Sequence, residues 1–229
     1  MSSFKIKLIA VITMLIDHIG IILHEYYTDA IILRFIGRVS FPLFVYLISI
    51  GCIHTKNIKK YMVRIGCFAI ISQVPFAVFN QVNLLENLNI FFTLFMGMIL
   101  IYFYDLIKNK GVIHLLAFIF VFAFVYFMAD IINVDYGGIG VMFIIIVYLA
   151  NISKFRKILV TSSILVMLFM LYTPTSINML IIFLWATLSI IPILLYNGKH
   201  GKKVNKLVFY SFYPIHMIIL SVLRYFITY

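Results

Sequence analysis

The feature that most constrains this chain is a nearly unbroken succession of long apolar segments separated by short polar connections. A membrane-spanning helix needs roughly 17–25 mostly apolar residues, and windows of that length predict about nine spans. Only 11% of the residues are charged, too few to cover a water-facing surface, so lipid must be the solvent. The sequence therefore predicts an all-α, polytopic transmembrane helix bundle that forms one domain over residues 1–229. The spans are expected near 6–24, 31–53, 61–79, 88–106, 112–131, 137–150, 158–173, 176–196 and 206–227.

The basic residues fall mostly into alternate connections, and most acidic residues fall into the others. Cytoplasmic connections of membrane proteins carry the excess of Lys and Arg, which places the N-terminus inside and the C-terminus outside. The net charge of +11 does not indicate nucleic-acid binding, because the basic residues form small clusters between apolar segments rather than one patch. The many Ile, Lys, Asn and Phe residues suggest a low-GC bacterium. We therefore expect a multi-pass protein of the bacterial cell (inner) membrane, with membrane lipid as a partner and no nucleic acid.

The two cysteines, Cys52 and Cys67, lie in or beside apolar stretches without paired metal-ligand spacing. We expect them to be small buried apolar side chains, and we expect no metal site.

Three ionisable residues lie inside the predicted first two spans. They are Asp17, His18 and Arg38. An ionisable group at the bilayer centre costs about 2.5–3.5 kcal/mol, so such residues are candidates for function. Asp17 and Arg38 should lie at similar depth and can form a salt bridge, while His18 can face a reaction site as a general base. The alternative is that all three merely lock the two helices together.

Further polar residues lie in later spans: Gln73, Asn89, Thr93, Tyr213 and His216. Interhelical hydrogen bonding explains Gln73, Asn89 and Thr93 without any function. The same side chains can instead contact substrate or stabilise an oxyanion, and for His216 packing and substrate contact are equally open. Prolines 42, 75 and 214 are expected to kink their helices and open a cavity.

A basic cluster follows the second predicted span: His54, Lys56, Lys59, Lys60 and Arg64. Contact with lipid headgroups and a role in membrane topology explain it without further function. The functional alternative is a docking site for a phosphorylated cytoplasmic donor.

The polar positions, taken in order, resemble those of the TraX family. The strings that carry the resemblance are Leu-Ile-Asp-His-Ile-Gly (15–20), Arg-Phe-Ile-Gly-Arg-Val-Ser-Phe-Pro-Leu-Phe (34–44), His-Thr-Lys-Asn (54–57), Ile-Ser-Gln-Val-Pro-Phe (71–76), Leu-Asn-Ile-Phe-Phe-Thr-Leu (88–94) and Phe-Tyr-Ser-Phe-Tyr-Pro-Ile-His (209–216). They extend over nearly the whole chain.

TraX acetylates the N-terminus of a conjugative pilin subunit, and the family is distantly similar to acyltransferase type 3 proteins and to heparan glucosaminide N-acetyltransferase. Those proteins use cytoplasmic acetyl-CoA and an essential histidine on an early helix. The resemblance implies a membrane-bound acetyltransferase in which His18 is catalytic, beside Asp17 and Arg38. It also implies acetyl-CoA bound by the basic cluster, and an acceptor amine or hydroxyl on a pilin-like peptide or a glycan.

Two other functions fit the same residues. A solute or ion transporter could use Asp17, His18, Arg38 and His216 as an intramembrane path, although no repeated halves are visible. A non-catalytic membrane partner in a secretion or conjugation system would not depend on His18.

Overall fold

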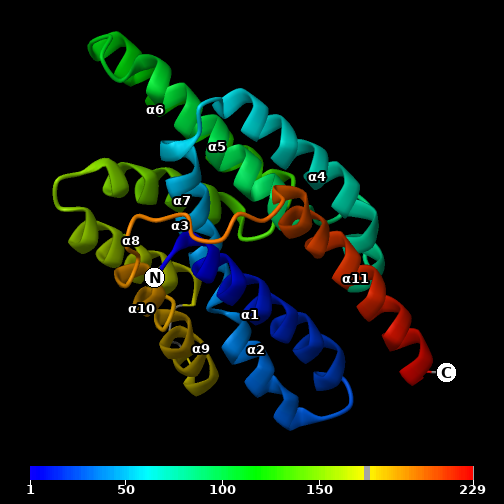
Figure 1. Cartoon of the computed structure of the whole chain (residues 1–229). Helices are drawn as coiled ribbons and strands as arrows, with labels where there is room; N and C mark the ends of the chain where they lie inside the picture. Colours follow the sequence, from blue (N-terminus) through cyan, green and yellow to red (C-terminus); the bar gives the residue numbers. More distant parts are fainter. Residues whose placement is uncertain (173–175, 229) are drawn as a thin grey trace.

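The computed structural model describes residues 1–172 and 176–228, which form helices joined by short connections (Figure 1). These described residues contain no β-strand, and one isolated β-bridge joins Leu88 to Val134. The predicted all-α architecture is therefore confirmed. The helices are α1 (Ser3–His24), α2 (Ile31–Gly37), α3 (Ser40–His54), α4 (Ile58–Asn80), α5 (Ile90–Ile107), α6 (Val112–Ile131), α7 (Gly137–Ile152), α8 (Arg156–Leu171), α9 (Ile177–Thr187), α10 (Ile190–Leu194) and α11 (Lys206–Thr228), and a 3-10 turn, η1 (Thr28–Ala30), precedes α2.

Seven helical segments within the described ranges are long and apolar enough to cross a membrane, where the sequence predicted nine. Helices α7 and α8 have 16 residues each, which span about 24 Å against a hydrocarbon core of about 30 Å. The chain therefore has the make-up of a multi-pass membrane protein. The seven segments are Ser3–His24, Thr28–His54, Ile58–Asn80, Ile90–Ile107, Val112–Ile131, Ile177–Leu194 and Lys206–Ile227.

Two of these seven segments are interrupted, one between α2 and α3 and the other between α9 and α10. A different proline accounts for each interruption. Proline has no backbone N–H, so the carbonyl four residues earlier receives no helical hydrogen bond. Pro42 leaves the carbonyl of Arg38 without one, and α2 ends just before Arg38. Pro192 does the same to Leu188, directly after the end of α9. Arg38 therefore lies at a helix break within the segment Thr28–His54.

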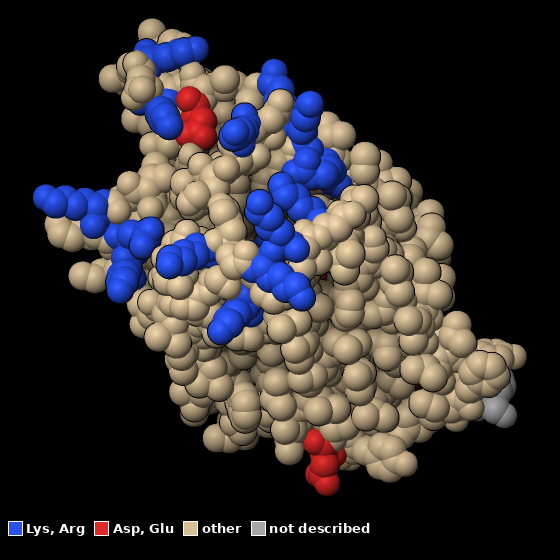
Figure 2. All heavy atoms as spheres, in the orientation of Figure 1, with Lys and Arg blue, Asp and Glu red and all other residues tan. Residues whose placement is uncertain are grey.

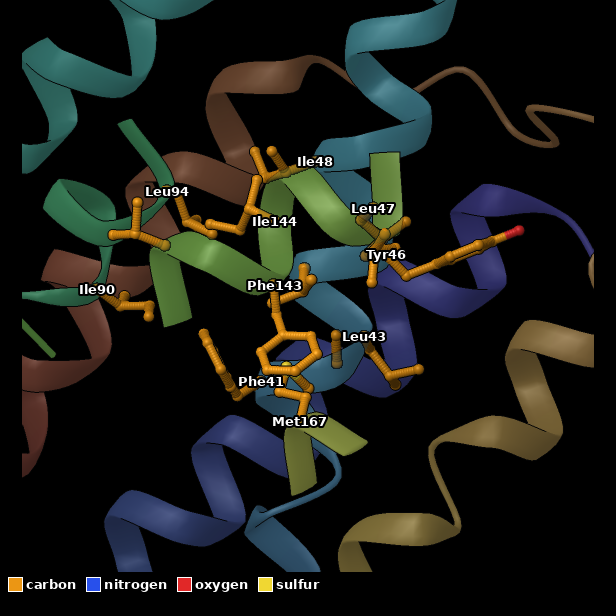
Figure 3. Packing of buried hydrophobic residues seen from close by; sticks show 14 of the residues in the cluster. Phe41, Leu43, Tyr46, Leu47, Ile48, Ile90, Leu94, Phe143, Ile144 and Met167 are labelled. Atoms are coloured by element: carbon orange, nitrogen blue, oxygen red, sulfur yellow. The ribbon is translucent and has the colours of Figure 1, made fainter. Parts of the chain in front are cut away.

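The core is centred on α7, with α3, α5 and α8 packed against it (Figure 3). Side chains such as Leu43, Phe143 and Ile144 are at most 2% exposed. Helices α5 and α7 approach closely at Gly97, where a Cβ atom would lie 2.6 Å from Ile144 Cδ1. A side chain at position 97 would therefore push these helices apart, and glycine there keeps the scaffold compact.

The connections gather at two ends of the bundle. One end, where α1 begins, carries the connections 55–57, 108–111, 153–155 and 195–205. We call it the basic end. The opposite end carries the connections 25–30, 81–89 and 132–136, the last two joined by the Leu88 amide donating to the Asn133 carbonyl at 2.9 Å. Figure 2 shows the visible lysines and arginines gathered over the region where Figure 1 places the N-terminus and the connection that follows α10.

Candidate functional site

A cavity of about 440 Å³ opens at the basic end. Its walls come from α1, α3, α4, α5 and α11 and from the connection 195–205. Five lysine or arginine side chains line it, and none of its lining residues is acidic. Such a mouth attracts anions, because like charges within low-dielectric walls add to one strong local potential. The charged or imidazole side chains are Lys7, His54, Arg64, His200, Lys202, Lys203 and Lys206.

Backbone hydrogen bonds hold the connection 195–205 over this mouth. The first amides of a helix have no partner inside the helix. In α1 the amide of Ser3 donates to the carbonyl of Lys199 at 2.9 Å, and that of Phe4 donates to the carbonyl of His200 at 3.1 Å. The chain segment that satisfies α1 therefore also places Lys202 and Lys203 beside the cavity.

The basic cluster predicted from the sequence only partly lines the cavity. His54 and Arg64 do line it, whereas Lys56, Lys59 and Lys60 do not. These three side chains are exposed on the turn before α4 and on its first turn, and Lys59 lies over the ring of Tyr102 at 5.7 Å. The other lining lysines, Lys7, Lys202, Lys203 and Lys206, were interpreted from the sequence only as signals of membrane topology. They come from the start of α1 and from the chain around residues 202–206, and no local motif connects these two segments.

The cavity extends inward along two helices. Its lining residues follow α1 from Ser3 to Met14 and α11 from Lys206 to Tyr213, a depth of about 16 Å along α1. Tyr213, which is 4% exposed, lines this inner end. Its ring centroid lies 6.3 Å from that of His18 and 5.7 Å from that of His216. The phenol ring is therefore the partition between the cavity and two imidazoles.

His18, which is half-buried, and His216, which is buried, form a pair behind that partition. His18 Nδ1 and His216 Nε2 are 2.6 Å apart, and the two rings are within 16° of parallel. Phe212 packs parallel to the far side of His216, and Phe79 meets His18 edge-on at 5.2 Å. Neither histidine lines the cavity directly. The structure thus brings together the predicted residues His18, Tyr213 and His216 from the two ends of the chain.

Asp17 is next to this pair, and its closest partner differs from the one expected. The predicted salt bridge with Arg38 is present, with Arg38 Nη2 3.9 Å from Asp17 Oδ1, and Arg34 is a second and closer partner, with Nη1 2.8 Å from Oδ2. Gly37 allows this approach, because a Cβ atom there would overlap the Asp17 carboxylate. Arg38 also lies over the ring of Tyr172 at 5.9 Å. Two guanidinium groups therefore share the Asp17 carboxylate beside His18, and Asp135 lies within electrostatic range of both.

The three polar side chains on α4 and α5 have their hydrogens engaged within the protein. The Gln73 amide donates to the carbonyls of Leu84 and Asn87, each at 2.7 Å. The Asn89 amide donates to the carbonyl of Ala69 and to Gln73 Oε1, each at 2.8 Å. Neither amide has a hydrogen left for an oxyanion. The Thr93 hydroxyl likewise donates, to the carbonyl of Asp135, so all three fasten the connections at the opposite end.

A second hollow, of about 410 Å³, lies at the opposite end between the connections 81–89 and 132–136. Asn80, Asn87, Asn133 and Asp135 line it, with apolar neighbours that include Phe76. Tyr136, at φ 64°, follows Asp135 in the left-handed region, which a bulky side chain rarely adopts. The sequence analysis did not single out Asp135, since an acid in a connection is ordinary on a membrane protein.

Replacing Asp135 with asparagine is expected to raise the melting temperature at pH 8. Burial raises the pKa of Asp135 to about 6, with Asp17 raising it further and Arg38 opposing the shift. The folded protein therefore holds a proton that the unfolded chain releases near pH 4, so stability falls as pH rises from about 4 to 6. We expect a gain of about 1–3 kcal/mol in the free energy of unfolding above pH 6, declining to none at pH 4. Thermal melts across pH should show it, with the exposed Asp29→Asn as control; equal melting of wild type and Asp135→Asn at pH 8 would contradict the prediction.

Among the described residues, no group of three or more His, Cys, Asp or Glu side chains could hold a metal ion. Of the cysteines, Cys52 is buried, as expected, and Cys67 is exposed.

Comparison with known proteins gives two matches. A family model with the description TraX protein matches residues 2–224. The chain is also similar to the "Probable fimbrial assembly protein FimC, serogroup H1" of Dichelobacter nodosus, with 26% identity over 246 residues, covering 99% of this chain and 97% of that protein. No solved structure matches the chain.

Proposed function

Because the chain belongs to the TraX family, we propose that it is a membrane-bound acetyltransferase that moves an acetyl group from acetyl-CoA to an amine or hydroxyl acceptor. The family is linked to acetylation of pilin subunits, and the relative from Dichelobacter nodosus is named as a fimbrial assembly protein. Both names favour a pilin-like peptide as the acceptor, with a glycan as the other class that suits the same chemistry.

One observation carries this proposal: the cationic cavity at the basic end leads inward to the ring that covers the histidine pair. Acetyl-CoA has several phosphate charges at one end and a thioester at the other. Its phosphates suit the lysines at the mouth, because charged donors form the strongest hydrogen bonds with phosphate oxygens. Its narrow arm then extends along the apolar wall of the cavity toward Tyr213 and His18.

The basic end is proposed to face the cytoplasm, where acetyl-CoA is found. Connections rich in Lys and Arg remain on the cytoplasmic side. In this orientation α1 begins inside, and His18 lies nearer the outer end of α1, only six residues before its last residue. The acceptor would then arrive from the outer side.

The hollow at the opposite end is the proposed route for the acceptor. Phe76 and Asn80 line it, and between them on α4 lies Phe79, which contacts His18. The carboxylate of Asp135 and the nearby amides supply hydrogen-bonding groups that a peptide or a sugar can use. Donor and acceptor would thus approach the histidine pair from different ends.

In the proposed reaction, His18 removes the proton from the acceptor as its nitrogen or oxygen attacks the acetyl carbonyl carbon. The carbon–sulfur bond of the tetrahedral intermediate then breaks, and the CoA thiolate takes the proton back from His18. Arg38 is the candidate to stabilise the oxyanion, since its buried Nε has no hydrogen-bond partner among the described residues. The amides of Gln73 and Asn89 are fully engaged elsewhere.

Purified protein in liposomes tests the proposal. Acetyl-CoA should be consumed and radioactive acetyl should appear on an added peptide with a free N-terminus or on a glycan. Flux of solutes or ions across the liposome membrane without acetyl-CoA consumption would replace the enzyme with a transporter. Neither turnover nor flux, together with stable co-purification of a pilus assembly, would favour a non-catalytic partner.

Changing Lys202 and Lys203 together to glutamine is expected to raise KM for acetyl-CoA by about twofold to thirtyfold, at about 0.2–1 kcal/mol for each exposed charge pair lost. The rise should shrink at high salt, which screens such charges, while kcat stays unchanged. The matched control is the double change of Lys154 and Lys157 to glutamine. These exposed lysines carry the same charge and lie at the same end but outside the cavity lining. Equal KM values for the two variants would contradict the assignment of the donor site.

A further inference from the structure

We infer that His216 fixes the tautomer of His18, so that Nδ1 of His18 carries the hydrogen and Nε2 of His18 is the atom that accepts a proton. The assignment of the tautomer rests on geometry alone. The role of His18 Nε2 in catalysis rests on the proposed function. It makes His216 a positioning residue rather than the substrate contact that the sequence left open.

The hydrogen-bond chain starts at a group that can only accept. His216 Nδ1 lies 2.7 Å from the carbonyl oxygen of Phe212, one turn earlier on α11. A carbonyl has no hydrogen to give, so Nδ1 of His216 must carry one. In a neutral imidazole the other nitrogen then has no hydrogen and is an acceptor. His216 Nε2 is that acceptor.

The next link follows from the 2.6 Å contact between His216 Nε2 and His18 Nδ1. One hydrogen must lie between these two nitrogens, and it belongs to His18 Nδ1. Nε2 of His18 is consequently left with its lone pair. This nitrogen is what a general base needs, and the chain Phe212 carbonyl, His216, His18 determines which nitrogen it is.

A charged His216 would reverse the direction of that hydrogen bond, and its surroundings oppose the charge. His216 is 4% exposed and is packed by the rings of Phe212, Tyr213 and His18. Asp17 and the two arginines that share it lie beside His18, and Asp135 is within electrostatic range of these three groups. A cationic His216 would lose its hydration in this aromatic packing. The neutral form of His216 is therefore the one that fits.

The same packing fixes the ring planes. Phe79 and Tyr213 meet His18 at interplanar angles of 62° and 63°, and Phe212 lies within 17° of parallel to His216. Rotation of either imidazole would require these rings to move. A neutral positioning residue also suits the membrane interior. It orients the base, as a carboxylate does in hydrolases, but it adds no buried charge.

The test compares two replacements of His216. Glutamine offers a side-chain oxygen near the place of Nε2 and can accept from His18, whereas leucine fills similar space and cannot. We expect His216→Gln to keep kcat within about tenfold of wild type and His216→Leu to lose about 10²-fold, the lower end of the range for a lost general base, because part of its His18 still carries the hydrogen on Nδ1. KM for acetyl-CoA should stay the same in both, because His216 does not line the cavity. Equal kcat values for these two variants, with both folded by gel filtration, would overturn the catalytic role.

A second readout does not depend on activity. Nitrogen-15 NMR of histidine-labelled protein distinguishes protonated from bare ring nitrogens, and the His18 signals are identified by their loss in His18→Gln. The wild type should show Nδ1 protonated and Nε2 bare in His18, and His216→Leu should show a mixture. A wild-type His18 with Nε2 protonated would overturn the inference, whatever reaction the protein catalyses. The expected tautomer in a protein that lacks acetyl transfer would uphold the geometry and remove the proposed function.

Discussion

Changing His18 to alanine is expected to lower acetyl transfer by about 10²–10⁴-fold, the usual contribution of a positioned general base. No other described side chain holds a bare nitrogen beside the inner end of the cavity, since the other imidazole of the pair donates and accepts within the protein. Acetyl-CoA binding should persist, because His18 does not line the cavity. The loss should therefore fall on kcat, with KM for acetyl-CoA nearly unchanged.

The matched control for this prediction is His24→Ala. His24 is on the same helix, less than two turns further along, and is exposed at its end. Transfer should continue at the wild-type rate in that variant. If His18→Ala kept wild-type turnover while remaining folded, the reaction would have to proceed without this imidazole.

Changing Arg34 to methionine is expected to destabilise the fold by about 3–5 kcal/mol, the usual cost of removing one partner from a buried ion pair. Arg34 is the near partner of Asp17, at 2.8 Å, and both side chains are mostly buried, at 24% and 15% exposed. Without Arg34 the carboxylate keeps only the distant guanidinium of Arg38, at 3.9 Å. Thermal melts in detergent should therefore show a large decrease in melting temperature.

Two further variants make the Arg34 prediction specific. Arg38→Met should cost less, because the closer pair between Arg34 and Asp17 remains. Adding Asp17→Asn to Arg34→Met should recover part of the loss, since no buried carboxylate is then left without its partner. A variant with Arg34→Met alone that melts at the wild-type temperature would show that Asp17 does not need this partner.

The predicted salt bridge between Asp17 and Arg38 is present at 3.9 Å, but the closer partner Arg34, one helical turn earlier, was not predicted. Arg34 and Arg38 are four residues apart, so both lie on one helix face at depths that differ by about 6 Å. Depth estimated from span boundaries cannot separate them. The break caused by Pro42 also turns the chain after Arg38, and its direction depends on packing against α1 at Gly37, which no local pattern encodes.

The features that could not be predicted from the sequence depend on contacts between residues far apart in the chain. The apolar runs predicted the helices well, because in lipid every backbone group must be satisfied within its own segment. His18 and His216 are 198 residues apart and were proposed separately, yet only the fold shows that they touch. Lys202 and Lys203 line the cavity because backbone hydrogen bonds join their connection to α1, and no sequence signal predicts that pairing.

The aromatic partition at Tyr213 separates the cavity at the basic end from the hollow at the opposite end. If the two were joined, they would form a pore, and a pore would dissipate the proton-motive force of the cell. The rings of Phe79, Phe212 and Tyr213 enclose the imidazoles on both helices. In the proposed reaction the acetyl group would pass this partition, while protons, which need a continuous file of water, would be kept from leaking through.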